Sequence, residues 1–540
     1  MRAVCWAVCL SVTLAGAVSA QAPAAEPARE GFSETLEVQG VNVEAVVTDK
    51  QGRRVPGLTA RDFRLLVDGK PVHVDFFLEV REGRAAQTAR LPGAAGEPEV
   101  ATLEAGEAVP TNYLVFIDDY FSPLTLRNEV LKSLSRELRS LGARDRVAVV
   151  AFDGRGSRVL SSWAPASEGL EHLLGQAGRQ KRFLTRADLD LNTGPLPVGA
   201  AQPLGKGLMS EPVADAAGDR SLRELEGIEN VVAASAASLR AFADQPGRKV
   251  ALVASGGWRV DQRAMMGLEL PAYVKDGYSL LDPLIDTANL LGYTLYPIHL
   301  AEKARLVPSA EPQLASAASG ASTMELAAAQ NSLVLSARQT GGRLLMPGNN
   351  NYLQRVTEDT RSYYWLGFTH TGGDMRRVRL EVQALRPGVE VRSRSSFLPL
   401  SRSAKVAMQV ESAVLTGDLV GMEPLDVSLG RPVRVSRKAL RVPVSLRIPM
   451  KDITLLPNGS YQVARLELRT ASTDKDGGRS LVAKVPLEIR IQGEAPPADG
   501  HLQHDLQLGL RNVPQYVLVS IHDVASGKTL AARVPFEPEK

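Results

Sequence analysis

The sequence between residues 113 and 298 alternates short apolar runs with longer stretches in which apolar residues recur at helical spacing. Each run has the length of a strand and little polar interruption, which is typical of strands covered on both faces in a parallel sheet. Charged residues such as Arg127 fall on the other faces of the helical stretches. The runs fall at 113–117, 147–152, 249–254 and 293–298, and the helical stretches at 126–141 and 280–291. This order predicts a doubly wound, mostly parallel α/β sheet.

The composition is that of an ordinary globular protein. Of 540 residues, 44% are apolar and 23% are charged, so the disordered, collagenous and coiled-coil classes are disfavoured. At about 150 residues per domain, the length predicts about three or four structural units. The 63 Lys and Arg residues nearly balance the 60 Asp and Glu residues, and a formal net charge of +3 does not favour a nucleic-acid partner.

Residues 1–20 have the composition of a secretory signal peptide. Arg2 precedes a run of uncharged, mostly apolar residues, and small residues at its end indicate cleavage near Ala20. We therefore expect a secreted or periplasmic protein, with an uncleaved anchor or a lipoprotein cleaved at Cys9 as alternatives. Cys5 and Cys9 are the two cysteines, so the cleaved chain would lack disulfides, thiolate metal sites and cysteine nucleophiles. No later stretch is predicted to span a membrane.

Changes in sequence texture divide the rest of the chain. Strand-like segments around an Asp68-Gly69 turn predict a small N-terminal β unit, and the aromatic segment 363–368 predicts a strand buried on both faces. Strand signals without a helical repeat predict an Ig-like β-sandwich at the C-terminal end. The predicted units are the β unit at 33–82 completed by 376–398, a linker at 83–110, the α/β domain at 111–372 with an insertion at about 155–220, and the sandwich at 401–540.

A polar cluster follows the first strand of the predicted parallel sheet. Asp118, Asp119 and Ser122 place two carboxylates and a hydroxyl at the carboxyl edge, where doubly wound folds bind ligands. A structural alternative is that Asp118 and Asp119 cap the next helix and complement its dipole. Gly-x-Ser-x-Gly, His-Glu-x-x-His and paired-carboxylate arrangements are absent from the sequence, so enzymatic activity is poorly supported.

A series of short motifs between about residues 33 and 398 resembles one family. Their order is more specific than any one of them. They are Val46-Val47-Thr48-Asp49, Gly57-Leu58-Thr59, Asp62-Phe63, Asp68-Gly69-Lys70-Pro71, Pro246-Gly247-Arg248-Lys249, Ser255-Gly256-Gly257, Thr340-Gly341-Gly342-Arg343, and Arg361-Ser362-Tyr363-Tyr364 with Leu366-Gly367. With the strand ending at Asp118, they resemble a von Willebrand factor type A (VWA) domain, and more narrowly the secreted VWFA-related proteins of Acidobacteria.

The resemblance implies a metal-ion-dependent adhesion site, in which oxygen ligands hold a partly hydrated Mg²⁺ that a partner's carboxylate completes. Asp118 matches the first position of the family's motif and Ser122 the last. The middle serine is replaced by Tyr120, and the later aspartate falls at Ser255 or Gly256, neither of which is acidic. We therefore expect a degenerate site with no firmly bound cofactor and at most weak Mg²⁺ binding, for which Asp119 or Asp153 would have to substitute.

The sequence thus favours an exported, non-enzymatic protein that serves protein–protein interaction or adhesion through a VWA-like domain, with an unidentified protein partner. Its interaction edge would include Tyr120, Ser255, Gly256 and Trp258, which follow two of the predicted parallel strands. Two alternatives stay open: a hydrolase-type enzyme in which the insertion forms a lid over the same edge, and a purely architectural envelope protein.

Overall fold

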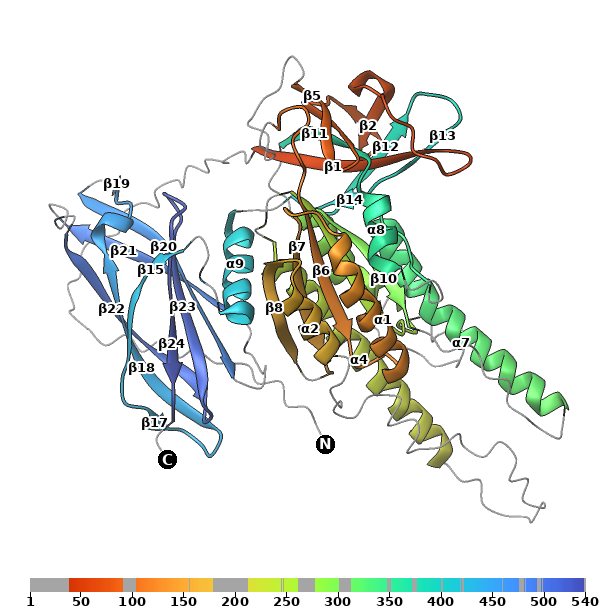
Figure 1. Cartoon of the computed structure of the whole chain (residues 1–540). Coiled ribbons are helices and arrows are strands. Elements are labelled where there is room, and N and C mark those ends of the chain that lie inside the picture. The colour runs from red at the N-terminus through yellow and green to blue at the C-terminus, as the bar shows by residue number, and fades with distance from the viewer. Residues whose placement is uncertain are drawn as a thin grey trace, which may run out of the picture. The chain divides into compact units, whose positions relative to one another are not determined.

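The computed structural model describes residues 38–538, apart from 91–102, 155, 178–211, 244, 246, 261–276, 301–311, 347–350, 372–375, 400–401, 418, 420–421, 459, 475–479, 481, 493–496 and 498. The predicted signal peptide therefore lies outside the described residues. The chain forms two compact units, one comprising Val38–Ser401 and the other containing Arg402–Lys540. Both units are coloured by residue number in Figure 1.

A five-stranded sheet in the order β10-β9-β6-β7-β8 occupies the middle of the first unit (Figure 1). The pairs β10–β9, β9–β6 and β6–β7 are parallel, so the predicted mostly parallel α/β sheet is confirmed. Val115 pairs with Val149 and Phe116 with Val253, which sets three of the four predicted strands side by side. The strands are β6 (Thr111–Asp118), β7 (Arg146–Phe152), β8 (Ser157–Pro165), β9 (Arg248–Ser255) and β10 (Tyr293–His299).

Helices cover this sheet because its strands are apolar on both faces. Val130 and Leu134 of α1 and Val356 of α8 share a core with alternate residues of β6, such as Val115. The helices α4, α6 and α7 also contact the sheet strands. The helices are α1 (Leu124–Glu137), α2 (Glu168–Ala177), α4 (Pro212–Ala241), α6 (Asp282–Leu291), α7 (Pro312–Gln339) and α8 (Tyr352–Thr360), with the 3₁₀ turns η2 (Leu138–Ser140) and η3 (Gly277–Leu281).

The predicted insertion at about 155–220 includes residues that belong to the α/β domain itself. Its first part forms β8, which pairs antiparallel with β7 and completes the edge of the sheet, followed by α2, which packs on α1. β8 has no continuous apolar run because an edge strand is covered less completely than a central one. The rest of the insertion, 178–211, lies outside the described residues. After this gap the chain continues with helix α4 (Pro212–Ala241).

Two further sheets of the first unit combine segments from both ends of its chain. One sheet has the order β13-β1-β11-β4-β5 and the other β14-β12-β2-β3, and a shared apolar core lies between them. The segment 376–398 thus pairs with 38–72, through β13 on β1 and β12 on β2. The strands are β1 (Val38–Asp49), β2 (Phe63–Val67), β3 (Lys70–Val72), β4 (Phe76–Arg81), β5 (Arg84–Arg90), β11 (Tyr363–Thr371), β12 (Val378–Ala384), β13 (Val389–Arg392) and β14 (Ser396–Phe397), with the 3₁₀ turn η1 (Ala60–Asp62) before β2.

The structure corrects two predicted boundaries of this β region. Residues 84–90, assigned to the linker 83–110, form β5, which pairs with β4 through backbone hydrogen bonds and therefore needs no apolar period of its own. The aromatic strand β11, assigned to the α/β domain, lies instead between β1 and β4. It is buried on both faces as predicted, with Tyr364 in one apolar core and Trp365 in another. The predicted Asp68-Gly69 turn is confirmed, since both residues have positive φ between the paired strands β2 and β3.

Buried charges join the β sheets to the α/β sheet. Arg248, at the start of β9, lies 2.9 Å from Glu44 of β1, and its guanidinium carbon is 4.0 Å from the ring centroid of Tyr363 of β11. Glu44 and Arg248 are both largely buried, so each supplies the charge that the other needs away from water. The pairing fixes the β region on the parallel sheet.

A second buried carboxylate, Asp359 of α8, binds groups from three other segments. It forms ion pairs with Arg54 and Arg392 and accepts a hydrogen bond of 2.7 Å from the Tyr296 hydroxyl. Burial alone would raise the pKa of Asp359, but the two guanidinium groups and the phenol outweigh it and hold this pKa below its ordinary value. Asp359 is therefore ionised in the folded protein at neutral pH.

In its described residues, the second unit contains two packed β-sheets and one α-helix. Its sheets have the orders β15-β24-β23-β20-β19, with β21 also on β20, and β16-β18-β17, with β22 on β18; one apolar core lies between them. The texture predicted as uninterrupted β begins instead with helix α9 (Arg402–Thr416), whose Val410 and Val414 pack on β20 and β23. The strands are β15 (Glu423–Pro424), β16 (Asp426–Leu429), β17 (Val433–Arg434), β18 (Ala439–Pro449), β19 (Leu456–Asn458), β20 (Tyr461–Asp474), β21 (Ala483–Gln492), β22 (His501–Arg511), β23 (Gln515–Asp523) and β24 (Thr529–Phe536), with the 3₁₀ turn η4 (Met450–Asp452) after β18.

Candidate functional site

Asp118 ends β6 with its carboxylate fully buried and surrounded by donors. Its Oδ1 accepts hydrogen bonds from the backbone N–H groups of Tyr120 at 3.1 Å and Phe121 at 3.0 Å. Its Oδ2 accepts from Ser255 Oγ at 2.6 Å and from Trp258 Nε1 at 3.1 Å. Burial raises the pKa of Asp118, and the hydrogen bonds from Ser255, Phe121 and Trp258 oppose this rise without cancelling it.

The four donors come from the loops after two neighbouring parallel strands. Tyr120 and Phe121 follow β6, whereas Ser255 and Trp258 end and follow β9. The carboxylate of Asp118 therefore joins two loops that are about 140 positions apart in the sequence. In this arrangement each carboxylate oxygen accepts two hydrogen bonds from the chain itself, so Asp118 acts as an internal cross-link.

Asp119 is bound by a second buried group, Arg127 of α1. The guanidinium donates from Nε to Oδ1 at 2.8 Å and from Nη2 to Oδ2 at 3.1 Å, in a bidentate pair whose side chains are 3% and 7% exposed. Arg127 Nη1 also donates to the carbonyl of Ala177, which ties α2 to the pair. The sequence pattern placed Arg127 on an outer helix face, and the structure shows this to be wrong because Asp119 supplies the charge that lets Arg127 be buried.

Neither aspartate caps α1 as the structural alternative expected. The helix begins at Leu124, its N-cap residue is Pro123, and no side chain forms a capping hydrogen bond there. Ser122 is buried and donates its hydroxyl to the Asp118 carbonyl. These polar groups therefore hold the loop that precedes the helix and do not cap its first turn.

The predicted interaction edge is largely internal. Ser255 and Trp258 are 0% exposed, which contradicts the expectation that their side chains face a partner. Gly256 is pressed against the β6 loop so closely that a Cβ atom there would lie 2.1 Å from the carbonyl oxygen of Phe121. The half-buried ring of Tyr120 packs against Gly154 in the same way, at 2.4 Å from an added Cβ. Gly256 therefore allows the loops after β6 and β9 to meet, and Gly154 leaves room for the Tyr120 ring.

A divalent cation does not fit this donor set. The resemblance requires Asp118, Ser122 and other oxygens to face a metal, but Asp118 faces N–H and O–H donors and Asp119 faces a guanidinium. Asp153, the other suggested substitute, accepts a hydrogen bond of 3.1 Å from the backbone N–H of Gly156. Within the described residues, no three His, Cys, Asp or Glu side chains gather in a way that could hold a metal ion.

His299 ends β10 in register with Ser255 and is 1% exposed. Burial lowers the pKa of His299, and a polar contact with the Gly256 backbone opposes this shift only in part. Neither ring nitrogen forms a hydrogen bond of normal geometry within the described residues. The neutral imidazole of His299 is thus packed in the interior beside the carboxyl edge of the sheet. No nucleophile among the described residues forms a hydrogen bond with it.

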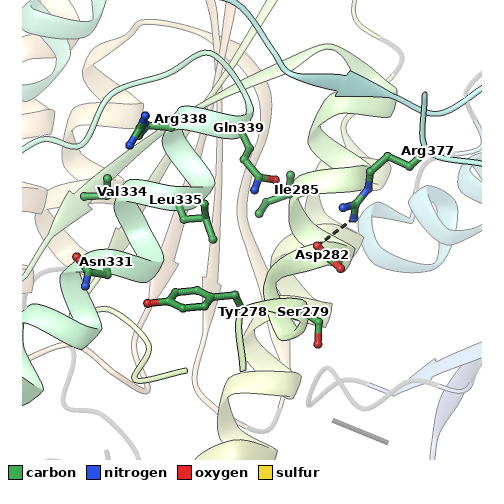
Figure 2. A pocket seen from close by; sticks show the side chains of 10 residues that line it. All are labelled: Tyr278, Ser279, Asp282, Ile285, Asn331, Val334, Leu335, Arg338, Gln339 and Arg377. Carbon is green, nitrogen blue, oxygen red and sulfur yellow. Dashed lines mark ion pairs between the residues drawn. The ribbon is translucent and has the colours of Figure 1, made fainter. Parts of the chain in front are cut away.

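A cavity of 560 Å³ lies elsewhere on the same unit, between η3–α6 and α7. Figure 2 shows Leu335 of α7 and Ile285 of α6 on opposite walls, with the Tyr278 ring directed across toward Asn331. Arg377 closes one end by pairing with Asp282 at 3.0 Å. The lining residues are Tyr278, Ser279, Asp282, Ile285, Asn331, Val334, Leu335, Arg338, Gln339 and Arg377.

We call this cavity, with its ten lining residues, the α6–α7 groove. Its rim carries an exposed cation. Arg338 is exposed on α7 and forms no ion pair within the described part of the chain. By contrast, Arg377 is held by both Asp282 and Asp286, at 3.0 Å and 2.7 Å. The α6–α7 groove therefore combines an apolar wall with one available guanidinium group, a pattern suited to an apolar side chain next to an acidic group.

Comparisons with known proteins show little. No protein-family model and no curated protein matches this sequence. An aerotolerance-related membrane protein from Bacteroides fragilis is 11% identical with a TM-score of 0.19, covering 46% of this chain and 96% of its own. The TFIIH p34 N-terminal domain is 13% identical with a TM-score of 0.19 and the same coverage. The pilus adhesin SpaC from Lactobacillus rhamnosus GG is 8% identical with a TM-score of 0.21, covering 89% of this chain and 62% of its own. At these TM-scores the likenesses carry no conclusion about function.

None of the described helices combines the length and apolar character needed to cross a bilayer. The sequence did not predict that Arg127 and Ser332 contact the residues around Asp118 and Asp119, nor did it predict the separate α6–α7 groove. Ser332 of α7 accepts a hydrogen bond of 3.1 Å from the backbone N–H of Trp258, more than 70 positions earlier. A buried aspartate followed eight positions later by an arginine was the one local signal, because this spacing lets a loop residue reach the first helical turn.

Proposed function

We propose that this chain is a non-enzymatic interaction protein whose α/β domain, of the VWA type, binds a segment of a partner protein. The observation that carries the proposal is the α6–α7 groove, with its apolar wall and its exposed arginine. The doubly wound sheet and the ordered motifs support the VWA type. The composition of residues 1–20 supports export, so that the partner would be met in the periplasm or outside the cell.

The arrangement at the carboxyl edge of the sheet supports a binding role that needs no cofactor. Asp118 and Asp119 are held by donors of the same chain, so these carboxylates are poorly placed to act as a base or as metal ligands. We propose that the edge is a rigid support and that recognition takes place in the α6–α7 groove. The half-buried Val334 and Leu335 would receive an apolar side chain of the partner, and Arg338 would pair with an acidic residue near it.

Selection from a displayed peptide library tests the proposal. The purified full chain should enrich peptides that place an apolar residue near Asp or Glu. Leu335→Asp should abolish their binding, and Arg338→Gln should weaken it about tenfold, because one charge-assisted hydrogen-bonded contact is lost. The matched control is Leu385→Asp, which changes a leucine that is 51% exposed outside the groove.

Two results would overturn this function. One is the absence of an enriched motif, or enrichment that Leu335→Asp leaves unchanged. The other is turnover by the purified chain in a screen of ester, peptide and glycoside substrates, which would favour the hydrolase alternative.

A further inference from the structure

The hairpin that joins β17 to β18 carries an unusual mixture of side chains. Residues 431–441 contain five cationic residues and no Asp or Glu. Among them, Val433 is 60% exposed and Val435 is 59% exposed. Large apolar side chains are exposed singly on many surfaces, but two next to a basic cluster form a distinct patch.

The hairpin has a defined shape. Val435 donates its backbone N–H to the Ala439 carbonyl at 3.1 Å, which closes the bend. Asn512, in the loop after β22, donates its backbone N–H to the Lys438 carbonyl at 3.0 Å and its side-chain amide to the Arg437 carbonyl at 3.3 Å. A third valine, Val513, which follows Asn512, is 39% exposed. Backbone contacts therefore fix the apolar and basic groups at one end of the sandwich, the end marked β17 in Figure 1.

Four of the five cations of this hairpin form no ion pair within the described part of the chain. Arg434, Arg437, Lys438 and Arg441 are exposed and form no ion pair there. Elsewhere on the same unit, exposed arginines do have acidic neighbours, as Arg511 does in Asp474 at 2.7 Å. Because these four cations lack such neighbours there, their field attracts anions from outside the protein.

We propose that this hairpin, defined as residues 431–441 with Val513, docks the protein on an anionic lipid surface. The arginines and the lysine would lie among the lipid phosphates, while Val433, Val435 and Val513 enter the boundary between headgroups and acyl chains. Cations on a short edge strand also discourage strand pairing between molecules, but that role does not require exposed valines. A soluble polyanion would use the cations alone, so the valines favour a surface that is both anionic and apolar.

Sedimentation of the purified full chain with lipid vesicles tests the proposal. The chain should bind vesicles that contain phosphatidylglycerol, bind pure phosphatidylcholine vesicles much more weakly, and be released by high salt. Arg434→Gln with Arg437→Gln should lower the partition coefficient about 25-fold, since each cation near the surface contributes a factor of about five. The matched control is Lys451→Gln with Arg465→Gln, which removes two cations of the same unit outside the hairpin.

A fluorescence measurement separates insertion from simple attraction. Val435→Trp should show a shift of tryptophan emission to shorter wavelength with phosphatidylglycerol vesicles and no shift with heparin. The proposal is overturned if the chain does not bind phosphatidylglycerol vesicles, if the hairpin variant and the control lose binding equally, or if heparin binds and gives the same shift. It is independent of the α6–α7 groove, so Leu335→Asp should leave vesicle binding unchanged.

Discussion

Replacement of Asp118 by alanine distinguishes an internal cross-link from a metal site. The substitution removes the acceptor for four hydrogen bonds. The backbone N–H groups of Tyr120 and Phe121 are only partly buried and can reach water, but the donors of Ser255 and Trp258 cannot. The expected effect therefore depends mainly on these two buried donors.

A buried donor left without an acceptor costs about 1–3 kcal/mol, so two of them predict a loss of about 2–6 kcal/mol. Removal of a desolvated carboxylate offsets part of this loss, as the raised pKa of Asp118 indicates. We expect Asp118→Ala to lower the free energy of unfolding of the unit Val38–Ser401 by about 3 kcal/mol. Asp118→Asn should lower it less, because it keeps one acceptor oxygen.

Urea unfolding followed by tryptophan fluorescence measures this effect. Apart from Trp6, the tryptophans are Trp163, Trp258 and Trp365, which all belong to the unit Val38–Ser401, so the signal is specific for it. The matched control is Asp153→Ala, which removes a half-buried carboxylate in a neighbouring loop that accepts a hydrogen bond from Gly156 and should cost less than Asp118→Ala.

A metal site predicts the opposite behaviour. Removing one carboxylate from an empty cation site relieves repulsion, so Asp118→Ala would be as stable as the parent chain or more stable. Mg²⁺ would also raise the unfolding midpoint of the parent chain, because a ligand that binds the folded state stabilises it. Either observation would refute the cross-link.

Three other sets of variants test the interactions within the same unit. Asp119→Ala and Arg127→Ala should each lower the free energy of unfolding in urea by about 3–5 kcal/mol, because each leaves a buried charge unpaired. The double variant should lose less than the sum of the two single losses. Additive losses would contradict the ion pair. Gly256→Ala should lower the free energy of unfolding by about 2 kcal/mol, because the added Cβ would overlap with a backbone carbonyl. Its control, Gly175→Ala, lies at an open position of α2 and should be neutral or slightly stabilising. Equal effects of the two substitutions would show that the loops after β6 and β9 do not pack closely. The stability that Asp359 contributes is present above its ordinary pKa of 3.8 and is lost as the pH falls below that value. Asp359→Asn should therefore make the free energy of unfolding fall less steeply between about pH 5 and pH 2. An unchanged slope would contradict an ionised Asp359 in the folded protein.

Local patterns predicted much of the fold. Runs such as 113–117 predict buried strands because a strand covered on both faces must be apolar throughout. The Asp68-Gly69 turn was predictable because its two positive φ values suit these residue types. Helix α9 also had a local signal, since Val406, Val410 and Val414 recur at helical spacing, but its neighbours in the sequence are strands.

Partners far apart in the sequence were not predictable. The sequence placed polar groups at the edge of the sheet, but only the tertiary structure decided that Ser255 and Trp258 turn inward to Asp118, 137 and 140 positions away. The tertiary structure also decided that β11 pairs with β1 and β4 and not with the strands of the α/β sheet. The physical reason is that periodicity records how much of a segment is buried, whereas the identity of the covering group depends on long-range pairing, which no single segment encodes.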